Sequence, residues 1–133
     1  MFVDACAIVS IMTGEETAAA YERALDQGGA WTSPLAAWEA IIVLSRPDQL
    51  NCRYSQAERV VTDWLAARDI ALHEMSSARE VLSHAVAVAE KHGVGRRALS
   101  NFDCFHYAYA KAAEDSLLTL DERLLATNIA KAM

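Results

Sequence analysis

The amino-acid sequence predicts an α/β fold, a three-layer α/β/α sandwich in which helices cover a short, mostly parallel central sheet. Short apolar segments suited to buried strands alternate along the chain with longer helical segments, an order typical of parallel sheets. The chain has 133 residues, of which 53% are hydrophobic, so it can bury a substantial core. We therefore expect residues 1–133 to form a single domain.

The predicted strands are short apolar runs bounded by polar or turn-forming residues. The predicted helices have apolar residues at helical spacing, and turn residues mark several of their ends. Gly28-Gly29 ends one helix, and Ser33-Pro34 begins the next, with Ser as the cap and Pro in the first turn. In chain order, the predicted elements are a strand over 1–4, a helix over 5–12, a helix over 15–27, a strand over 30–33, a helix over 34–44, a helix over 55–68, a strand over 69–74, a helix over 78–91, a helix over 100–112, a strand over 117–120 and a helical turn over 121–125.

In the second half of the chain, the helical segments are amphipathic, with apolar residues on one side and charged residues on the other. We expect the apolar sides to pack on the sheet. The residues on these sides are Val60, Val61, Trp64 and Leu65 in the first segment, Val81, Leu82, Ala85, Val88 and Ala89 in the second, and Phe105, Ala108, Tyr109 and Ala112 in the third.

Four acidic residues occupy positions that the predicted fold can bring together. Asp4 and Asp121 each follow a strand, Asp103 lies where a helix begins, and Glu39 is the acid of an otherwise apolar helix. Taken singly, each Asp is more often a helix cap or a turn residue, and Glu39 is equally compatible with a narrow solvent-facing stripe. Glu39 has no basic residue three or four positions away, so a buried Glu39 needs a partner from another element.

The carboxyl ends of parallel strands lie along one edge of a sheet, and we expect the four acids to meet at that edge. Ionised carboxylates share a pocket when cations lie among them, and the hard divalent cations Mg²⁺ and Mn²⁺ prefer oxygen ligands. Such ions lower the pKa of bound water and offset the charge that develops when a phosphodiester is cleaved. No P-loop, GxGxxG motif or Ser-His-Asp set indicates another chemistry. The four acids therefore predict metal-dependent phosphodiester hydrolysis.

The net charge of −6 and the pI near 5.1 argue against a protein whose whole surface attracts nucleic acid. The densest basic cluster lies in the glycine-containing loop that leads to Asp103. Its cations, Lys91, Arg96 and Arg97, are candidates for contact with a phosphate backbone, although a short charged loop is more often simply solvated. The acidic balance also suits a basic protein partner.

The cysteines and the chain's hydropathy favour a cytoplasmic protein. Cys6, Cys52 and Cys104 are odd in number and lack CxxC spacing, so we expect reduced thiols and no zinc site. No apolar run approaches the ~18 residues of a membrane span. Asp4 interrupts the apolar start of the chain, which argues against a signal peptide.

Four segments, in this order and spacing, resemble the PIN domain family, and specifically its VapC-type ribonuclease toxins from bacterial toxin–antitoxin pairs. They are Phe2-Val3-Asp4-Ala5-Cys6-Ala7-Ile8, the stretch from Ser33-Pro34 to Glu39, the stretch over 93–111 that contains Asp103-Cys104, and Leu117-Leu118-Thr119-Leu120-Asp121. Each motif is weak alone, whereas the ordered set spans almost the whole chain. Cys6 stands where the family usually has Ser or Thr, and Phe102 stands where it usually has Gly.

The resemblance implies a PIN-like fold and an acidic quartet that holds Mg²⁺ or Mn²⁺, formed by Asp4, Glu39, Asp103 and Asp121. It implies an endoribonuclease that cleaves single-stranded RNA, tRNA among the candidates, with a metal-activated water. It also implies a homodimer and a small antitoxin with a segment that covers the acidic pocket. Residues that could support the quartet are Cys6, Asn101 and Glu122.

Two alternatives from other classes stay open. A PIN-like module without activity, which binds protein or RNA, is suggested by Cys6 and Phe102. A receiver-type phosphorylation domain would also place an acid after its first strand. That interpretation is the weaker one, because such sites want paired acids there and Asp4 stands alone.

Overall fold

A computed structural model of the protein describes residues 1–74 and 76–133. Its centre is a four-stranded sheet in the order β3-β2-β1-β4, in which each neighbouring pair of strands is parallel. The chain therefore crosses over the sheet between strands, as the alternation of strand and helix segments predicts. The strands are β1 (Phe2–Val3), β2 (Trp31–Thr32), β3 (Ala71–Leu72) and β4 (Leu117–Leu118).

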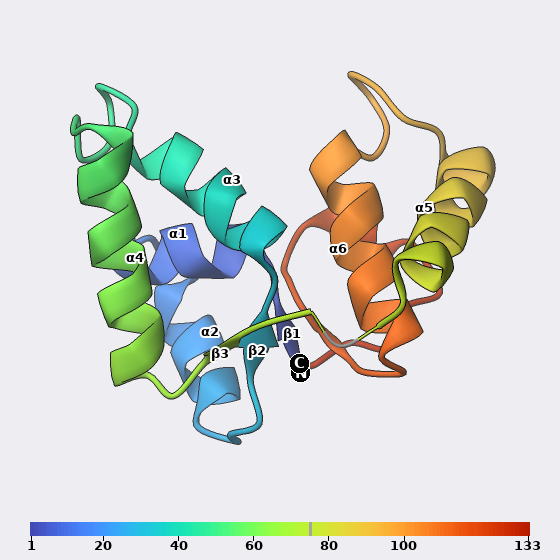
Figure 1. The fold of residues 1–133 in the computed structure, drawn as a ribbon, viewed down its shortest axis with the longest axis horizontal. Helices are drawn as coiled ribbons and strands as arrows, with labels where there is room; N and C mark the ends of the chain where they lie inside the picture. The colour runs from blue at the N-terminus through green and yellow to red at the C-terminus, as the bar shows by residue number, and fades with distance from the viewer. Residues whose placement is uncertain (75) are drawn as a thin grey trace.

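Helices cover both faces of this sheet, which confirms the predicted three-layer α/β/α sandwich (Figure 1). One layer contains α1 to α4, drawn blue to green, and the other contains α5 and α6, drawn yellow to orange. The helices are α1 (Ala5–Thr13), α2 (Ala18–Leu25), α3 (Pro34–Leu44), α4 (Tyr54–Ala67), α5 (Ala78–His92), α6 (Asn101–Ala112) and the single turn α7 (Glu122–Leu125).

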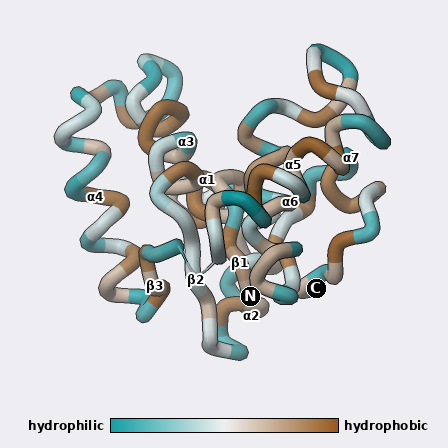
Figure 2. The backbone as a smooth tube through the Cα atoms, turned by 45° about the vertical axis from the view of Figure 1, so that its right-hand side comes forward, coloured by the Kyte–Doolittle hydropathy of each residue, from teal (hydrophilic) through white to brown (hydrophobic). Residues whose placement is uncertain are grey.

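The core is divided by the sheet, because successive residues of a strand face opposite sides. In β1, Phe2 packs with α5 and α6, whereas Val3 packs with α1 and α3. In β4, Leu117 and Leu118 divide in the same way. Apolar runs buried on both sides are typical of a parallel sheet covered by helices. Figure 2 shows the matching distribution, with hydrophilic segments mostly at the periphery.

Helix caps place several helix starts at the positions that the sequence predicts. In each case a side-chain oxygen accepts a hydrogen bond from a backbone N–H of the first turn, an interaction that contributes about 1 kcal/mol. The capping residues are Asp4 for α1, Ser33 for α3, Ser77 for α5, Ser100 for α6 and Asp121 for α7.

Some apolar residues expected in the core lie at the surface. Val60 on α4 and Leu82 on α5 are exposed. Each lies at the margin of the helix face that packs on the core, and not at its centre. Both residues of β3, at one edge of the sheet, are exposed as well. Among the described residues, no helix is both long enough and apolar enough to cross a membrane.

The pairing of β1 with β4 positions the candidate site. Val3 lies opposite Leu118, so the residues that follow these two strands leave the sheet side by side. Asp4 follows β1 directly, and Asp121 follows β4 after a two-residue step. The carboxyl ends of these two neighbouring strands thus bring both acids to one edge of the sheet.

Candidate metal centre

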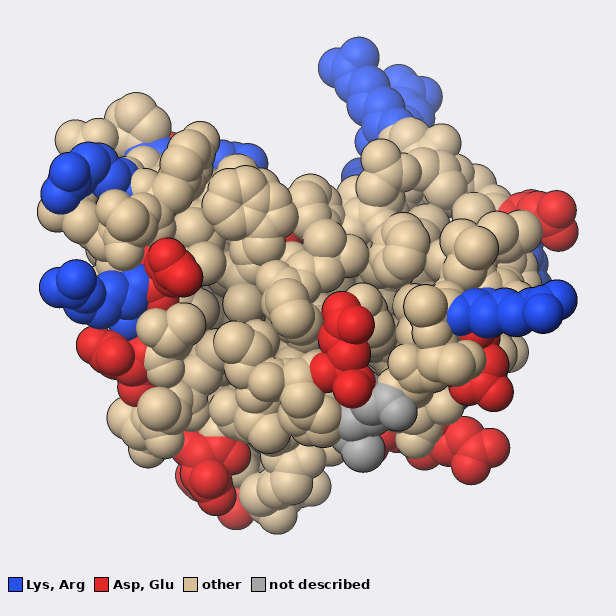
Figure 3. All heavy atoms as spheres, in the orientation of Figure 1, with Lys and Arg blue, Asp and Glu red and all other residues tan. Residues whose placement is uncertain are grey.

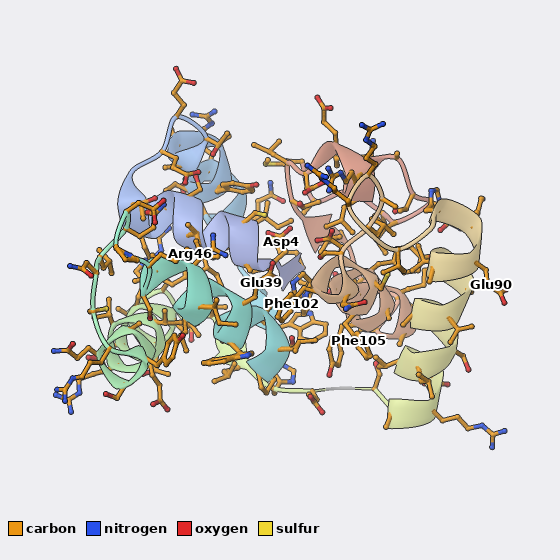
Figure 4. The ribbon with its side chains drawn as sticks, turned by 90° about the horizontal axis from the view of Figure 1, so that it is seen from above. Asp4, Glu39, Arg46, Glu90, Phe102 and Phe105 are labelled. Atoms are coloured by element: carbon orange, nitrogen blue, oxygen red, sulfur yellow. The ribbon has the colours of Figure 1, made fainter. Side chains whose placement is uncertain are left out.

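The structure gathers the four predicted acids at the carboxyl edge of the sheet, between α3 and α6. Asp4 caps α1, Glu39 projects from the middle of α3, and Asp103 lies in the first turn of α6. Figure 4 shows Asp4, Glu39 and Phe102 close together between these two helices, with Glu90 far from them on α5. The starts of α1, α6 and α7 and one face of α3 therefore surround the edge.

Asp4 is the most deeply buried of the four acids, with 1% of its surface exposed. Its Oδ1 accepts a hydrogen bond of 2.9 Å from the amide of Ala7. Its Oδ2 is one of the buried side-chain oxygens and nitrogens that have no hydrogen-bond partner among the described residues. Burial raises the pKa of Asp4 from 3.8 to about 6, and the charge of His106 is the largest influence in the other direction. A buried anionic oxygen without a donor is a position that a cation would stabilise.

The sequence predicts that a buried Glu39 needs a partner from another element. In the structure that partner is His106 on α6. His106 Nε2 lies 2.5 Å from Glu39 Oε2. The helix α3 is less buried than its apolar sequence suggests, since Trp38 is 43% exposed and the Glu39 side chain is 22% exposed. Glu39 thus lies at the boundary between the core and the solvent.

Sequence reasoning missed His106, although a signal for it was present. His106 follows Asp103 by three positions, so the two share one face of α6. An acid without a local partner on one helix, together with a histidine beside another candidate acid, indicates a contact between the two helices. Only 1% of the His106 surface is exposed, and its Nδ1 has no hydrogen-bond partner among the described residues.

The other two acids also take part in helix caps, Asp121 as the capping residue of α7 and Asp103 as the acid of the capping box that begins α6. Asp103 Oδ2 accepts from the Ser100 amide at 2.8 Å, and Ser100 Oγ accepts from the Asp103 amide at 3.0 Å, which forms a capping box. Asp121 Oδ1 accepts from the Arg123 amide at 2.8 Å. Each cap uses one carboxylate oxygen and leaves the second oxygen outside the cap.

Cys6 lies within electrostatic reach of all four acids. The protein atoms around its thiol raise the pKa of Cys6, and the charges of the acids raise it further, although part of the residue is accessible to solvent. In order of effect, these acids are Asp4, Glu39, Asp121 and Asp103. Cys6 and Glu39 also line a small pocket together. The four carboxylates therefore form one electrostatic unit around the start of α1.

The chemistry of these donors fits a hard divalent cation. They are carboxylate oxygens at the edge of a largely buried cluster, and Asp4 Oδ2 is orphaned there. In residues 1–74 and 76–133, however, no three His, Cys, Asp or Glu side chains converge to hold one ion. In the structure Glu39 contacts His106, while Asp103 and Asp121 each accept from a backbone amide through one oxygen.

The other residues predicted to support the quartet are Asn101 and Glu122. Asn101 and Phe102 line an aromatic groove between α3 and α6, to which Trp38, Phe105 and Tyr109 also contribute. Glu122 is exposed on α7, so it lies outside the buried part of the cluster.

The predicted basic residues are exposed at the rim of the same edge. Lys91 lies in the last turn of α5, and Arg96 and Arg97 lie in the loop that leads to α6. Figure 3 shows Lys and Arg atoms over this loop and, across a hollow in the surface, over the connection between α3 and α4. That connection contributes Arg46 and Arg53, which are also exposed. Cations thus flank the edge at which the acids gather.

Comparison with known families agrees with this arrangement. Residues 1–130 match the profile of the PIN domain family, whose members are generally metal-dependent nucleases. No curated protein matches the chain. Because the match covers nearly all of the sequence and the sheet order, helix layers and acidic edge accord with it, the chain belongs to the PIN domain family.

Proposed function

We propose that the protein is a metal-dependent endoribonuclease, the toxin of a VapBC-type toxin–antitoxin pair that acts in the cytoplasm. The observation that carries the proposal is the set of four carboxylates at the carboxyl edge of a PIN-family sheet. Their shared effect on one thiol supports a single acidic site. The resemblance of their sequence context to VapC-type toxins supports the finer assignment.

The residues that would hold Mg²⁺ or Mn²⁺ are Asp4, Glu39, Asp103 and Asp121. When bound, such an ion would supply an acidified water and positive charge at the phosphate. Asp4 Oδ2 is the acceptor that the fold leaves unpaired among the described residues. The capping bonds of Asp103 and Asp121 hold their side chains at the edge of the sheet. The buried wall of the cluster excludes bulk water from one side, which strengthens each of these interactions.

The surroundings of the acids support an RNA strand as the substrate. Lys91, Arg96 and Arg97 are exposed on one flank of the acidic edge, where they are available for phosphate contacts. The aromatic groove beside the acids offers Trp38 and Phe102 as surfaces on which an unpaired base can stack. A duplex does not present its bases in this way, so the groove favours single-stranded RNA.

Two protein partners complete the proposal. A cognate antitoxin with a basic segment suits the net charge of −6 and the acidic pocket that this segment would cover. A homodimer is supported by apolar side chains at the surface, among them Tyr54 at 61% and Leu72 at 45% exposure. The rings of Trp38 and Tyr54 contact each other edge to face with centroids 5.6 Å apart.

A second candidate function is a PIN-like module that binds protein or RNA without cleaving it. The specific observation in its favour is that no three potential ligands converge in residues 1–74 and 76–133. Cys6, which replaces the hydroxyl usual in the family, points the same way.

Cleavage assays distinguish the two functions. Purified protein, stripped of metal and partner, is incubated with end-labelled single-stranded RNA, total tRNA and a DNA of matched sequence, in Mn²⁺, Mg²⁺ or EDTA. Asp103→Asn removes one charge but keeps an oxygen for the Ser100 amide, and Asp63→Asn on the exposed side of α4 is the matched control. RNA fragments that require metal, vanish with Asp103→Asn and persist with Asp63→Asn support the nuclease. Folded protein that neither cleaves RNA nor binds Mn²⁺ favours the binding module.

A further inference from the structure

We propose that His106 is a positioning residue of the metal centre, which fixes the Glu39 carboxylate in place through a hydrogen bond from α6 to α3. The inference rests on the proposed function, since it concerns the site at which the cation would bind. It adds to the acidic quartet a residue that touches neither metal nor substrate and acts through one of the acids.

The contact has a defined direction. An ionised carboxylate only accepts hydrogen bonds, so Nε2 of His106 is the donor and Oε2 of Glu39 is the acceptor, at 2.5 Å. The bond occupies one oxygen of Glu39, and the second oxygen stays free of it. A glutamate has several rotatable bonds, and holding it by one oxygen removes much of the freedom that metal binding would otherwise have to restrict.

The imidazole itself is held rigidly. Only 1% of the His106 surface is exposed, and its ring lies 5.9 Å from that of Phe2 in β1 and 6.4 Å from that of Phe102 in α6. Phe2 in turn contacts Trp31 and Tyr109 through ring centroids 4.8 Å and 6.0 Å apart. The core therefore holds the histidine in place, and its hydrogen bond restricts the motion of the partly exposed Glu39 carboxylate.

The histidine also joins the two helices that carry separate members of the quartet. Glu39 lies on α3, whereas Asp103 lies on α6 three positions before His106. The His106 ring also lies beside that of Phe2, in the strand that ends at Asp4. A single side chain thus ties α3, α6 and the β1 edge together.

The test measures Mn²⁺ affinity by calorimetry, which requires no cleavage. His106→Phe keeps a ring of similar shape and removes the donor, and we expect it to weaken Mn²⁺ binding about 10-fold, the lower end for residues that orient metal ligands. His106→Gln restores an N–H donor near the position of Nε2 and should recover most of that affinity. His84→Phe on α5, remote from the acids, is the matched control and should bind as the wild type does.

A double-mutant cycle separates positioning from a general structural effect. If His106 acts through Glu39, then His106→Phe has no further effect on Mn²⁺ affinity in a Glu39→Ala background, which lacks the acceptor of the hydrogen bond. An equal weakening in both backgrounds, or wild-type affinity in a folded His106→Phe variant, would overturn the role of His106 while leaving the nuclease assignment intact. A wild-type protein that binds no Mn²⁺ would overturn both.

Discussion

Replacing Asp4 with Asn should stabilise the metal-free protein even though it removes a residue of the proposed active site. Asp4 is buried, and its Oδ2 lacks a hydrogen-bond partner among the described residues. Asn has nearly the same shape, and its side-chain oxygen can accept from the Ala7 amide as Asp4 Oδ1 does, so the cap of α1 is retained. The substitution therefore isolates the effect of the buried charge.

The magnitude follows from the pKa of Asp4, which is about 6 in the folded protein against an ordinary value of 3.8. A raised pKa means that the folded state binds the proton more tightly than the unfolded state, so the ionised group destabilises the fold as the pH rises. The cost is small near pH 4, and at pH 8 it reaches about 3 kcal/mol, at ~1.4 kcal/mol for each pH unit between the two values. At pH 5, about half of this cost remains.

Urea unfolding in EDTA at pH 8 and pH 5 measures the effect directly. We expect Asp4→Asn to raise the free energy of unfolding by about 3 kcal/mol at pH 8, equivalent to roughly 10 °C in Tm, and by about half as much at pH 5. Asp63→Asn, which removes an exposed acid from α4, should change the stability little at either pH. A less stable Asp4→Asn variant at pH 8, or a gain that does not shrink at pH 5, would refute the reasoning.

Metal should cancel the difference in stability between the wild type and the Asp4→Asn variant. Mn²⁺ at about 100 times its Kd stabilises a protein that binds it only in the folded state by roughly 3 kcal/mol. The wild type should gain this amount and the Asp4→Asn variant should not, so the difference between them disappears in Mn²⁺. Such behaviour is typical of active sites that keep a destabilising group for the sake of function.

Further predictions concern the surroundings of the site. Burial alone would raise the pKa of Asp115, but hydrogen bonds from the Trp31 indole, the amino terminus and the next amide lower it. Asp115→Asn should therefore reduce the free energy of unfolding at pH 7, measured by urea unfolding. This destabilisation should fade as the pH falls toward 3. Tyr21→Phe removes the acceptor of the Leu120 amide and should cost about 1 kcal/mol, with faster hydrogen exchange at that amide by NMR. Replacing Arg96 and Arg97 with Ala should weaken the salt dependence of RNA binding, measured in EDTA. The slope of log affinity against log salt concentration should fall by about 0.7 for each phosphate that the loop no longer neutralises. An unchanged slope would show that the loop does not bind RNA.

Much of the fold could be predicted from the sequence because local and global signals agree. Short apolar strands, each followed by a helix, admit few arrangements other than a parallel sheet with right-handed crossovers. The same topology explains why Asp4 and Asp121 could be placed together, since both follow strands that end at one edge. Residues such as Ser33, whose side chain caps α3, also reveal helix starts from local chemistry alone.

What could not be predicted depends on contacts between distant segments. The pairing of His106 with Glu39 joins residues 67 positions apart, and it forms only because α3 and α6 pack beside each other in the fold. The exposure of Trp38 has a similar origin. Its helix is apolar on nearly every side, which predicts burial, yet the position of α3 at the rim of the groove leaves this ring at the surface.

The cap and ligand roles of the acidic residues, which compete when only the sequence is known, are compatible in the structure. A cap needs one oxygen of a carboxylate, and the bonds from Ala7 to Asp4 and from Ser100 to Asp103 each occupy one. The same bonds fix the carboxylates at the edge of the sheet, where the partial positive charge of a helix start offsets part of the cost of their burial. An acid that takes part in a helix cap at this edge thus keeps one oxygen outside the cap, where it is available to a cation. The two roles separate by substitution, because Asn keeps the cap and loses the charge, whereas Ala loses both.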